Sequence, residues 1–100
     1  MLRASAQADL EAAFNYYFEE ANLILAGRFR DEADNAMVHI AEHPGTGSPR
    51  HSPAKGKDAI RFWAVKHFPY SIFYIERPSF IDVFRVLHQA SNIPNHLTTD

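Results

Sequence analysis

RFWAVKHFPYSIFYIERPSFIDVFRVLH, residues 61–88, is the stretch that decides the fold of this chain. It contains three runs of aromatic and β-branched residues, a composition typical of strands. The runs are separated by short breaks at residues 68–70 and 77–79, each containing a proline. Breaks of this length are typical of hairpin connections, so the stretch predicts a small antiparallel sheet.

Two helices are predicted before the sheet. Apolar residues recur there at the spacing of one helical face, and the pattern changes phase near Asn22. The first stripe consists of Leu10, Ala13, Phe14, Tyr17, Ala21 and Ile24, and the second of Leu25, Phe29, Ala33, Ala36, Met37 and Ile40. We therefore expect helices over residues 5–20 and 23–42, joined tightly as an antiparallel hairpin.

The ends of these helices are marked by local signals. Ser5 is a plausible N-cap of the first helix, after a short possible strand at Leu2–Ala4. His43–Pro44 should end the second helix, because proline disfavours the helical conformation of the residue before it. Residues 45–58 are rich in Gly, Pro and Ser and lack periodicity, so they predict a loop.

The predicted fold class is α+β, a helical hairpin packed on a small antiparallel sheet in a single domain over residues 1–100. Apolar residues make up 46% of the chain and charged residues 22%, a balance typical of globular proteins. The absence of cysteine excludes disulfides and thiolate metal sites. No apolar run is long enough for a signal peptide or a membrane span, so we expect a cytoplasmic protein.

The run YSIFYI is apolar on both faces of its strand. Ile72 and Tyr74 must face one way and Phe73 and Ile75 the other, because adjacent strand residues alternate. Two helices can cover only one face of such a sheet. We expect the other face to remain exposed as a partner surface; the alternative is that the N-terminal strand and the C-terminal tail fold over it.

Charge divides the chain into two halves. Residues 1–42 carry a balance of −5, and residues 43–100 carry +3 with five of the six histidines. A basic half could bind an acidic partner, either nucleic acid or protein. The basic residues that could follow a phosphate backbone, with rings among them for stacking, are Arg50, Lys55, Lys57, Arg61 and Lys66, with Trp63 and Phe68. The alternative is an ordinary solvated surface.

Three motifs suggest chemistry and are rejected. HIAEH, residues 39–43, matches a zinc-protease pattern, but it lies at a helix end directly before Pro44 and lacks an evident third ligand. Gly45 and Gly47 lack a lysine at phosphate-loop spacing and are interpreted as turn residues. No serine lies in a nucleophile motif, and no cofactor is expected.

The chain resembles the ParE branch of the ParE/RelE toxin superfamily. The resemblance covers about residues 8–97, and the stretches that carry it are DLEAAFNYY (9–17), AEHPGTGSPR (41–50), RFWAVKHFPYSIFYIE (61–76) and IDVFRVLHQASNIP (81–94). It implies a helical hairpin on an antiparallel sheet, and the toxin half of a type II toxin–antitoxin (plasmid stabilisation) pair with an antitoxin as partner. ParE members poison DNA gyrase, whereas RelE members cleave messenger RNA on the ribosome.

RVLHQASNIP, residues 85–94, tests the second possibility. The RelE pattern has a basic residue shortly after the histidine and a ring near Pro94, and this chain has neither. Ser91 also departs from ParE relatives, in which arginine is common at that place. If the protein is a ribonuclease, the catalytic candidates are Arg61, Lys66, Arg85 and His88. The alternative is structural: Arg85 and His88 pair with a nearby carboxylate such as Asp82, or cap the strand end.

A binding toxin that acts on gyrase is therefore the first hypothesis. A ribonuclease and an inactive antitoxin-binding remnant are the alternatives. For the antitoxin we expect a helix or extended segment across the hairpin and the sheet, with basic residues beside the acidic half. The predicted contact residues are aromatic or aliphatic: Phe14, Tyr16, Tyr17, Phe18, Phe73 and Ile75.

Overall fold

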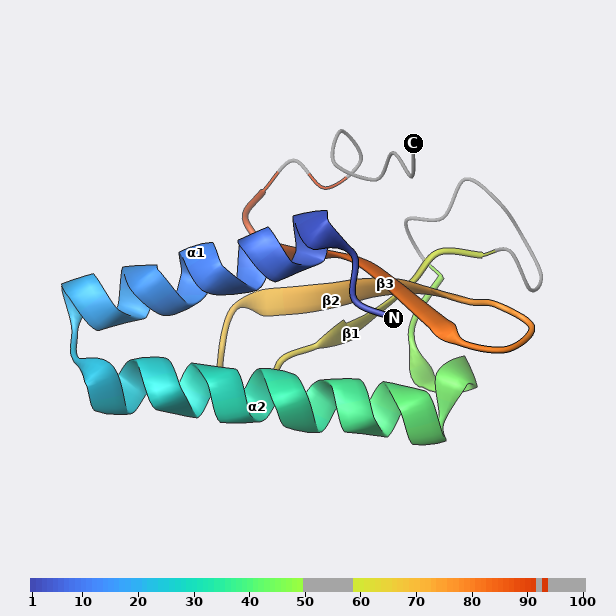
Figure 1. Ribbon diagram of the computed structural model, residues 1–100, viewed down its shortest axis with the longest axis horizontal. Coiled ribbons are helices and arrows are strands. Elements are labelled where there is room, and N and C mark those ends of the chain that lie inside the picture. The colour runs from blue at the N-terminus through green and yellow to red at the C-terminus, as the bar shows by residue number, and fades with distance from the viewer. Residues whose placement is uncertain (50–58, 92, 94–100) are drawn as a thin grey trace.

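The computed structural model describes residues 1–49, 59–91 and 93 of the chain. Its elements are α1 (Ala4–Glu20), α2 (Leu23–Glu42), a 3-10 turn (Pro44–Thr46), β1 (Arg61–Ala64), β2 (Tyr70–Glu76) and β3 (Ile81–His88). The two helices form an antiparallel hairpin that packs as one layer on the sheet, and the end of the hairpin projects beyond the strands (Figure 1). The predicted α+β fold is confirmed.

The helices form where the sequence predicts them, and each buries one apolar stripe. The buried residues are Ala6, Leu10 and Ala13 of α1, and Ala26, Phe29, Ala33, Ala36 and Ile40 of α2. The phase change at Asn22 has a local cause: its Oδ1 atom accepts a hydrogen bond of 2.8 Å from the Leu25 N–H and so caps α2. Ile24, which the sequence placed in the first stripe, lies beyond this junction and is 73% exposed.

The prediction that Ser5 caps α1 is wrong. The helix begins one residue earlier, with Arg3 at the N-cap position and without a side-chain cap. The reason is that the N-terminal segment pairs with the outer edge of β3 through a parallel bridge between Leu2 and Val83, in place of the predicted strand. Ser5 therefore faces β3, where its hydroxyl donates to the Phe84 carbonyl oxygen at 2.8 Å.

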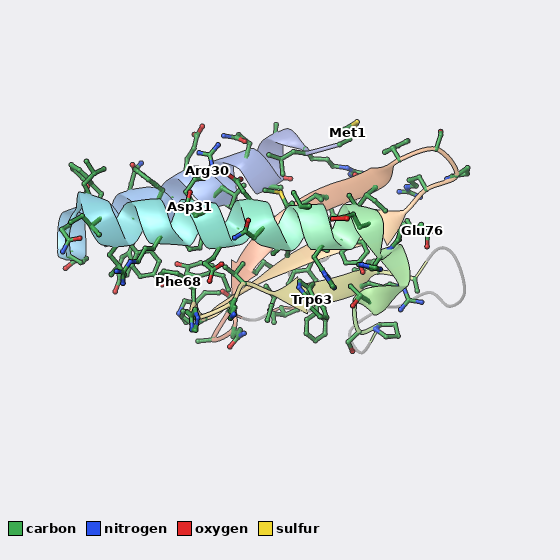
Figure 2. All side chains as sticks on the ribbon, turned by 90° about the horizontal axis from the view of Figure 1, so that it is seen from below. Met1, Arg30, Asp31, Trp63, Phe68 and Glu76 are labelled. Atoms are coloured by element: carbon green, nitrogen blue, oxygen red, sulfur yellow. The ribbon has the colours of Figure 1, made fainter. Side chains whose placement is uncertain are left out.

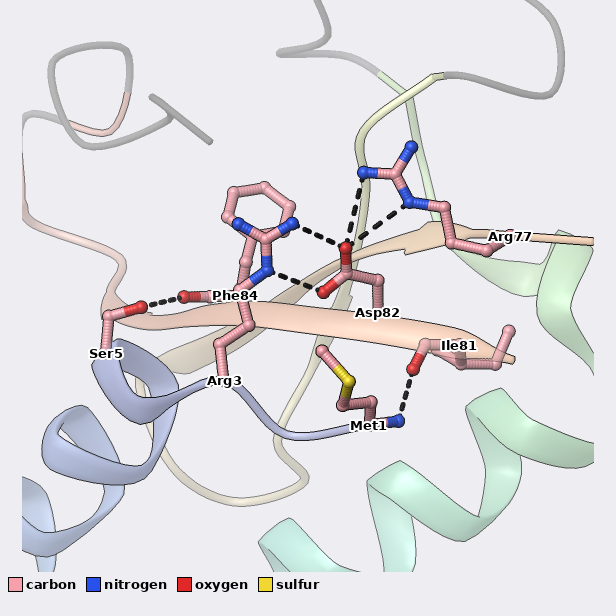
Figure 3. Close-up of polar contacts among 7 residues, drawn as sticks. All are labelled: Met1, Arg3, Ser5, Arg77, Ile81, Asp82 and Phe84. Atoms are coloured by element: carbon pink, nitrogen blue, oxygen red, sulfur yellow. Dashed lines mark hydrogen bonds and ion pairs between the residues drawn. The ribbon is translucent and has the colours of Figure 1, made fainter. Parts of the chain in front are cut away.

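Asp82 fixes this junction. It is 2% exposed, and its carboxylate accepts bonds of 2.6 and 2.8 Å from Arg3 and of 3.3 Å from Arg77 (Figure 3). The hydrogen bond from Arg3 is the main cause that lowers the pKa of Asp82. Asp82 is therefore not the carboxylate that pairs with Arg85 or His88, because its partners are Arg3 and Arg77.

The sheet has the order β1-β2-β3, with both pairs antiparallel. Ile72 and Tyr74 pack in the core under the helices, as the strand alternation predicts. The expectation that the opposite face stays exposed is wrong, because Phe73 and Ile75 are 0% and 4% exposed. They belong to a second cluster that contains Ile60, Phe84 and Leu87, with Phe62 and Ile93 packed against it.

The segment after α2 is held on the sheet by a buried hydroxyl. Tyr74 donates to the Pro44 carbonyl at 2.7 Å and accepts from the Gly47 N–H at 2.9 Å. A Cβ atom on Gly47 would lie 2.5 Å from the Tyr74 hydroxyl oxygen. The φ of −70° at Gly47 is open to any residue, so backbone conformation does not require glycine here. The close approach of the Tyr74 hydroxyl does. The rest of the predicted loop, residues 50–58, lies outside the described residues.

No helix in the part of the chain that the structure describes is both long and apolar enough to cross a membrane.

Candidate functional site

Arg85 is engaged by α1. Its Nε and Nη2 atoms donate to the Asp9 carboxylate at 2.7 and 3.1 Å, and the same carboxylate accepts the Val86 N–H at 2.9 Å. Hydrogen bonding to Asp9 is the main cause that raises the pKa of Arg85. Both side chains are largely buried, with 25% and 17% of their surface exposed. This two-point pair uses two of the five guanidinium N–H donors of Arg85 and balances its charge.

His88 lies exposed at the end of β3. Its Nδ1 atom accepts the Ala90 N–H at 3.0 Å, so in the neutral ring the proton must be on Nε2. The ring meets Tyr70 edge to face, with centroids 5.1 Å apart. Burial, and then the neighbouring Tyr16, raise the pKa of Tyr70, which favours its protonated form. The surface around His88 therefore offers N–H and O–H donors rather than a free base.

A hollow of about 270 Å³ lies between α1 and the end of β3, and we call it the β3-end hollow. Its lining residues are Asp9, Ala12, Ala13, Tyr70, Arg85, Val86, Leu87, His88 and Ser91. It thus brings together two of the four residues that sequence reasoning proposed for catalysis, Arg85 and His88. The lining alanines and Tyr70 were not proposed, since only the packing of α1 on β3 places them there.

The other two catalytic candidates lie elsewhere. Arg61 starts β1 opposite Tyr74, whereas His88 pairs with Tyr70. This offset of four residues along β2 amounts to about 13 Å, and the two-strand separation adds roughly 10 Å across the sheet. Arg61 donates to the Gly47 carbonyl at 2.7 Å, which ties it to the loop. Lys66 is exposed and lines a different hollow beside Trp63. The four candidates do not converge on one point.

The residues of the HIAEH motif are used in packing. The His39 ring stacks on Trp63, with centroids 4.6 Å apart and 19° between the planes. Trp63 itself is labelled in Figure 2. Its Nε2 atom lies 3.2 Å from the Thr46 hydroxyl. His43 lies beside it, with ring centroids 5.0 Å apart. Within the described residues, no group of three His, Asp or Glu side chains could hold a metal ion.

The hairpin supplies exposed apolar surface at its projecting end. Tyr16 and Phe18 are 56% and 50% exposed, and Leu23 and Ile24 of α2 are 62% and 73% exposed. We call these four residues the hairpin end. The sequence did not predict Leu23 and Ile24 as surface residues, although the change of phase in the apolar pattern beside them indicates that the buried stripe of the first helix ends there.

The other predicted contact residues lie outside this surface. Tyr17 packs in the core, where its ring meets Phe29, Phe68 and Tyr70. Phe14 is half-buried beside a hollow that residues of α1 form with Arg30 of α2. Phe73 and Ile75 are buried in the second cluster, as described above. Of the six residues predicted for antitoxin binding, only Tyr16 and Phe18 are exposed.

The proposed nucleic-acid surface is only partly described. Arg50, Lys55 and Lys57 lie outside the described residues. Of the two rings among these basic residues, Phe68 packs on the hydrophobic core. Trp63 is half-buried under His39. Within the described part of the chain, Phe68 and Trp63 therefore act mainly as packing residues rather than as rings on which bases could stack.

Comparison with solved structures identifies the fold class. The chain matches a structure titled "Chromosomal ParDE TA system from P. aeruginosa", with a TM-score of 0.68, 17% sequence identity, and coverage of 86% of this chain and 89% of that one. At this identity the match shows a shared fold: a helical hairpin on a three-stranded antiparallel sheet. No match is found among curated proteins.

The family is shown by the sequence itself. The model of the family described as "ParE toxin of type II toxin-antitoxin system, parDE" matches residues 1–93. The chain belongs to this family, as its resemblance to ParE toxins predicted.

Proposed function

We propose that this ParE-family toxin acts by binding DNA gyrase, without catalysing a reaction of its own, and that an antitoxin neutralises it. The observation that carries the proposal is the state of the catalytic candidates. Arg85 is held at two points by Asp9, and the Nδ1 lone pair of His88 is engaged by Ala90.

RNA cleavage requires a base or acid and a group that stabilises the charged phosphorane. Arg85 keeps three N–H donors while it is paired, but Asp9 balances the charge with which it would stabilise the phosphorane, and giving up Asp9 would leave a largely buried carboxylate without its charged partner. Arg61 lies too far along the sheet to replace it. These constraints favour a binding toxin over a ribonuclease.

The antitoxin contact is proposed at the hairpin end. Burying apolar surface stabilises a complex by about 25 cal/mol per Å², so one ring buried there contributes on the order of 2 kcal/mol. Aromatic anchors often dominate the affinity of such contacts. Glu19 and Glu20 are exposed beside these residues, so the antitoxin segment should be amphipathic with a basic border.

Purified gyrase tests the target. We expect the protein to make gyrase accumulate cleaved DNA, and His88→Ala to do so equally well, because His88 has no catalytic role in this proposal. Unaffected supercoiling by gyrase at a high ratio of toxin would reject the target. Harmless expression of the lone chain, in a host whose gyrase is sensitive, would instead favour an inactive remnant.

Substitution at the hairpin end tests the antitoxin contact. Ile24→Asp should weaken binding to the product of the short reading frame beside the gene, whereas Val38→Asp should not. The two positions are matched, since both are exposed aliphatic residues of α2 at 73% and 57% exposure. Equal binding of the two variants would remove the hairpin end from the contact.

A ribonuclease is the second candidate. The observation that favours it is that His88 is exposed beside Tyr70 at the β3-end hollow, with its Nε2 proton available for donation. If it is correct, transcripts are cleaved after induction and His88→Ala protects them. Intact transcripts during growth arrest would exclude it.

A further inference from the structure

The N-terminal segment and then α1 satisfy backbone groups on the outer edge of β3 as far as Asp9. Leu2 pairs with Val83 through the backbone, Ser5 bonds the Phe84 carbonyl, and Asp9 accepts the Val86 N–H. The next positions on this face of the helix are Ala12 and Ala13, which have no polar side-chain atom to offer.

The register shows which backbone groups are then left on the open side. The Gln89 N–H bonds to the Pro69 carbonyl, and the Tyr70 carbonyl accepts from Val65 on β1. Tyr70 therefore directs its backbone groups away from its partner His88, so the backbone of His88 points outward. The same alternation directs the backbone of Val86 outward, in agreement with its bond to Asp9.

Two of these outward groups have no partner within the described residues. The Val86 N–H is bonded to Asp9 and the His88 carbonyl accepts the Ser91 N–H. The Val86 carbonyl and the His88 N–H remain, and both belong to residues that line the β3-end hollow. A carbonyl and an N–H two residues apart on one edge form the pair that a single residue of a parallel strand can satisfy, through its own N–H and C=O.

We propose that an extended segment of the antitoxin adds to this edge in parallel with β3, with one residue bonded to both Val86 and His88. This inference rests on the proposed antitoxin partnership and specifies how part of the antitoxin binds. The edge already accepts Leu2 in the same direction, so the added segment continues an existing pairing. Its side chains that face α1 must be small, because they lie against Ala12 and Ala13 in a hollow of about 270 Å³.

The acidic residues of α1 indicate where the antitoxin segment should carry a basic residue. Asp9 and Glu20 lie on one side of α1 about three turns apart, with Tyr16 between them. From Ala12 to Glu20 the helix rises about 12 Å, a length that an extended chain covers in about four residues. The segment should therefore carry a basic residue roughly four positions after the bonded one, opposite the exposed Glu20.

Overlapping synthetic peptides that cover the product of the adjacent reading frame test this inference. One peptide should bind and slow the hydrogen exchange of the His88 amide. N-methylation of its bonded residue removes the donor to Val86 and should weaken binding by about tenfold or more. Ala12→Gln should weaken binding similarly by filling the hollow, while Ala41→Gln, at an exposed alanine on α2, should have no effect.

The outcomes separate this inference from the function on which it rests. If the intact product binds but the His88 amide exchanges as in the free chain, the strand addition is wrong and the partnership stands. Equal binding of the Ala12→Gln and Ala41→Gln variants, each shown to be folded by circular dichroism, would likewise contradict the strand addition and leave the partnership standing. If the product does not bind at all, both the partnership and the strand addition fail, whatever the result with gyrase.

Discussion

Removing the hydroxyl of Tyr74 should destabilise the protein through the loop that follows α2. Tyr74 is fully buried, and its hydroxyl makes two bonds, of 2.7 Å to the Pro44 carbonyl and 2.9 Å from the Gly47 N–H. Each is worth about 1 kcal/mol net, so Tyr74→Phe should lower the free energy of unfolding by about 2 kcal/mol. For a domain of this size, that corresponds to a fall of about 8–16 °C in Tm.

Gly47→Ala perturbs the same contact from the other side. The added Cβ would lie 2.5 Å from the Tyr74 hydroxyl oxygen and 2.9 Å from both the Arg61 Cβ atom and the Phe62 carbonyl oxygen. The Phe62 contact is with backbone, so the loop itself must move. Overpacking of this kind costs about 1–3 kcal/mol.

The double variant tests the reasoning. Without the hydroxyl, the closest of the three contacts of the new methyl group disappears. The double variant should therefore be more stable than the sum of the two single effects implies, by about 1 kcal/mol. The assay is chemical denaturation followed by Trp63 fluorescence and by circular dichroism. Additive effects within about 0.3 kcal/mol would refute the claim that Tyr74 and Gly47 compete for one space.

Three further predictions concern the contacts that hold the hairpin. Asp9→Ala should cost about 2–3 kcal/mol in thermal unfolding, because it leaves a largely buried Arg85 unpaired, while the exposed Glu11→Ala should change it by less than about 0.5 kcal/mol. Asn22→Ala should cost about 1 kcal/mol by the same assay and Asn22→Asp very little, since either Asn or Asp accepts the Leu25 N–H. Asp82 has a lowered folded pKa, so its contribution is complete above its unfolded pKa of about 3.9 and is lost as the pH falls through the folded pKa. Acid unfolding below about pH 4 should thus be steeper in the wild type than in Asp82→Asn, and equal slopes would contradict this.

The helices and strands could be predicted because their signals are local. The stripe of α2 and the alternation of β2 follow from spacing within each segment, and the helix ends at Asn22 and Pro44 follow from single residues. The start of α1 was placed one residue late, at Ser5, because the competing partner of that hydroxyl is the Phe84 carbonyl, 79 residues further along the chain. Nothing near Ser5 signals that contact.

The candidate site also depends on contacts between residues far apart in the sequence, which local patterns do not indicate. Closeness in sequence suggests Asp82 as a carboxylate partner of Arg85. Three positions along a strand, however, separate side chains by about 10 Å. The carboxylate that reaches Arg85 is Asp9, 76 residues away. The prediction that the second face of the sheet stays exposed failed for a similar reason, since Ile60 and Ile93 pack on that face from outside the three strands.

Arg85 shows why substitution at a candidate catalytic residue needs care in this protein. Its guanidinium joins β3 to α1, so Arg85→Ala removes a largely buried charge pair and should reduce folded protein together with toxicity. Lost toxicity of that variant would fit a ribonuclease and a binding toxin equally well. The His88 side chain is exposed, and its one hydrogen bond within the described residues is with the neighbouring Ala90 N–H, so His88→Ala should leave the fold intact. A folded but harmless His88→Ala variant would therefore count against the binding toxin, and a folded, fully toxic one against the ribonuclease.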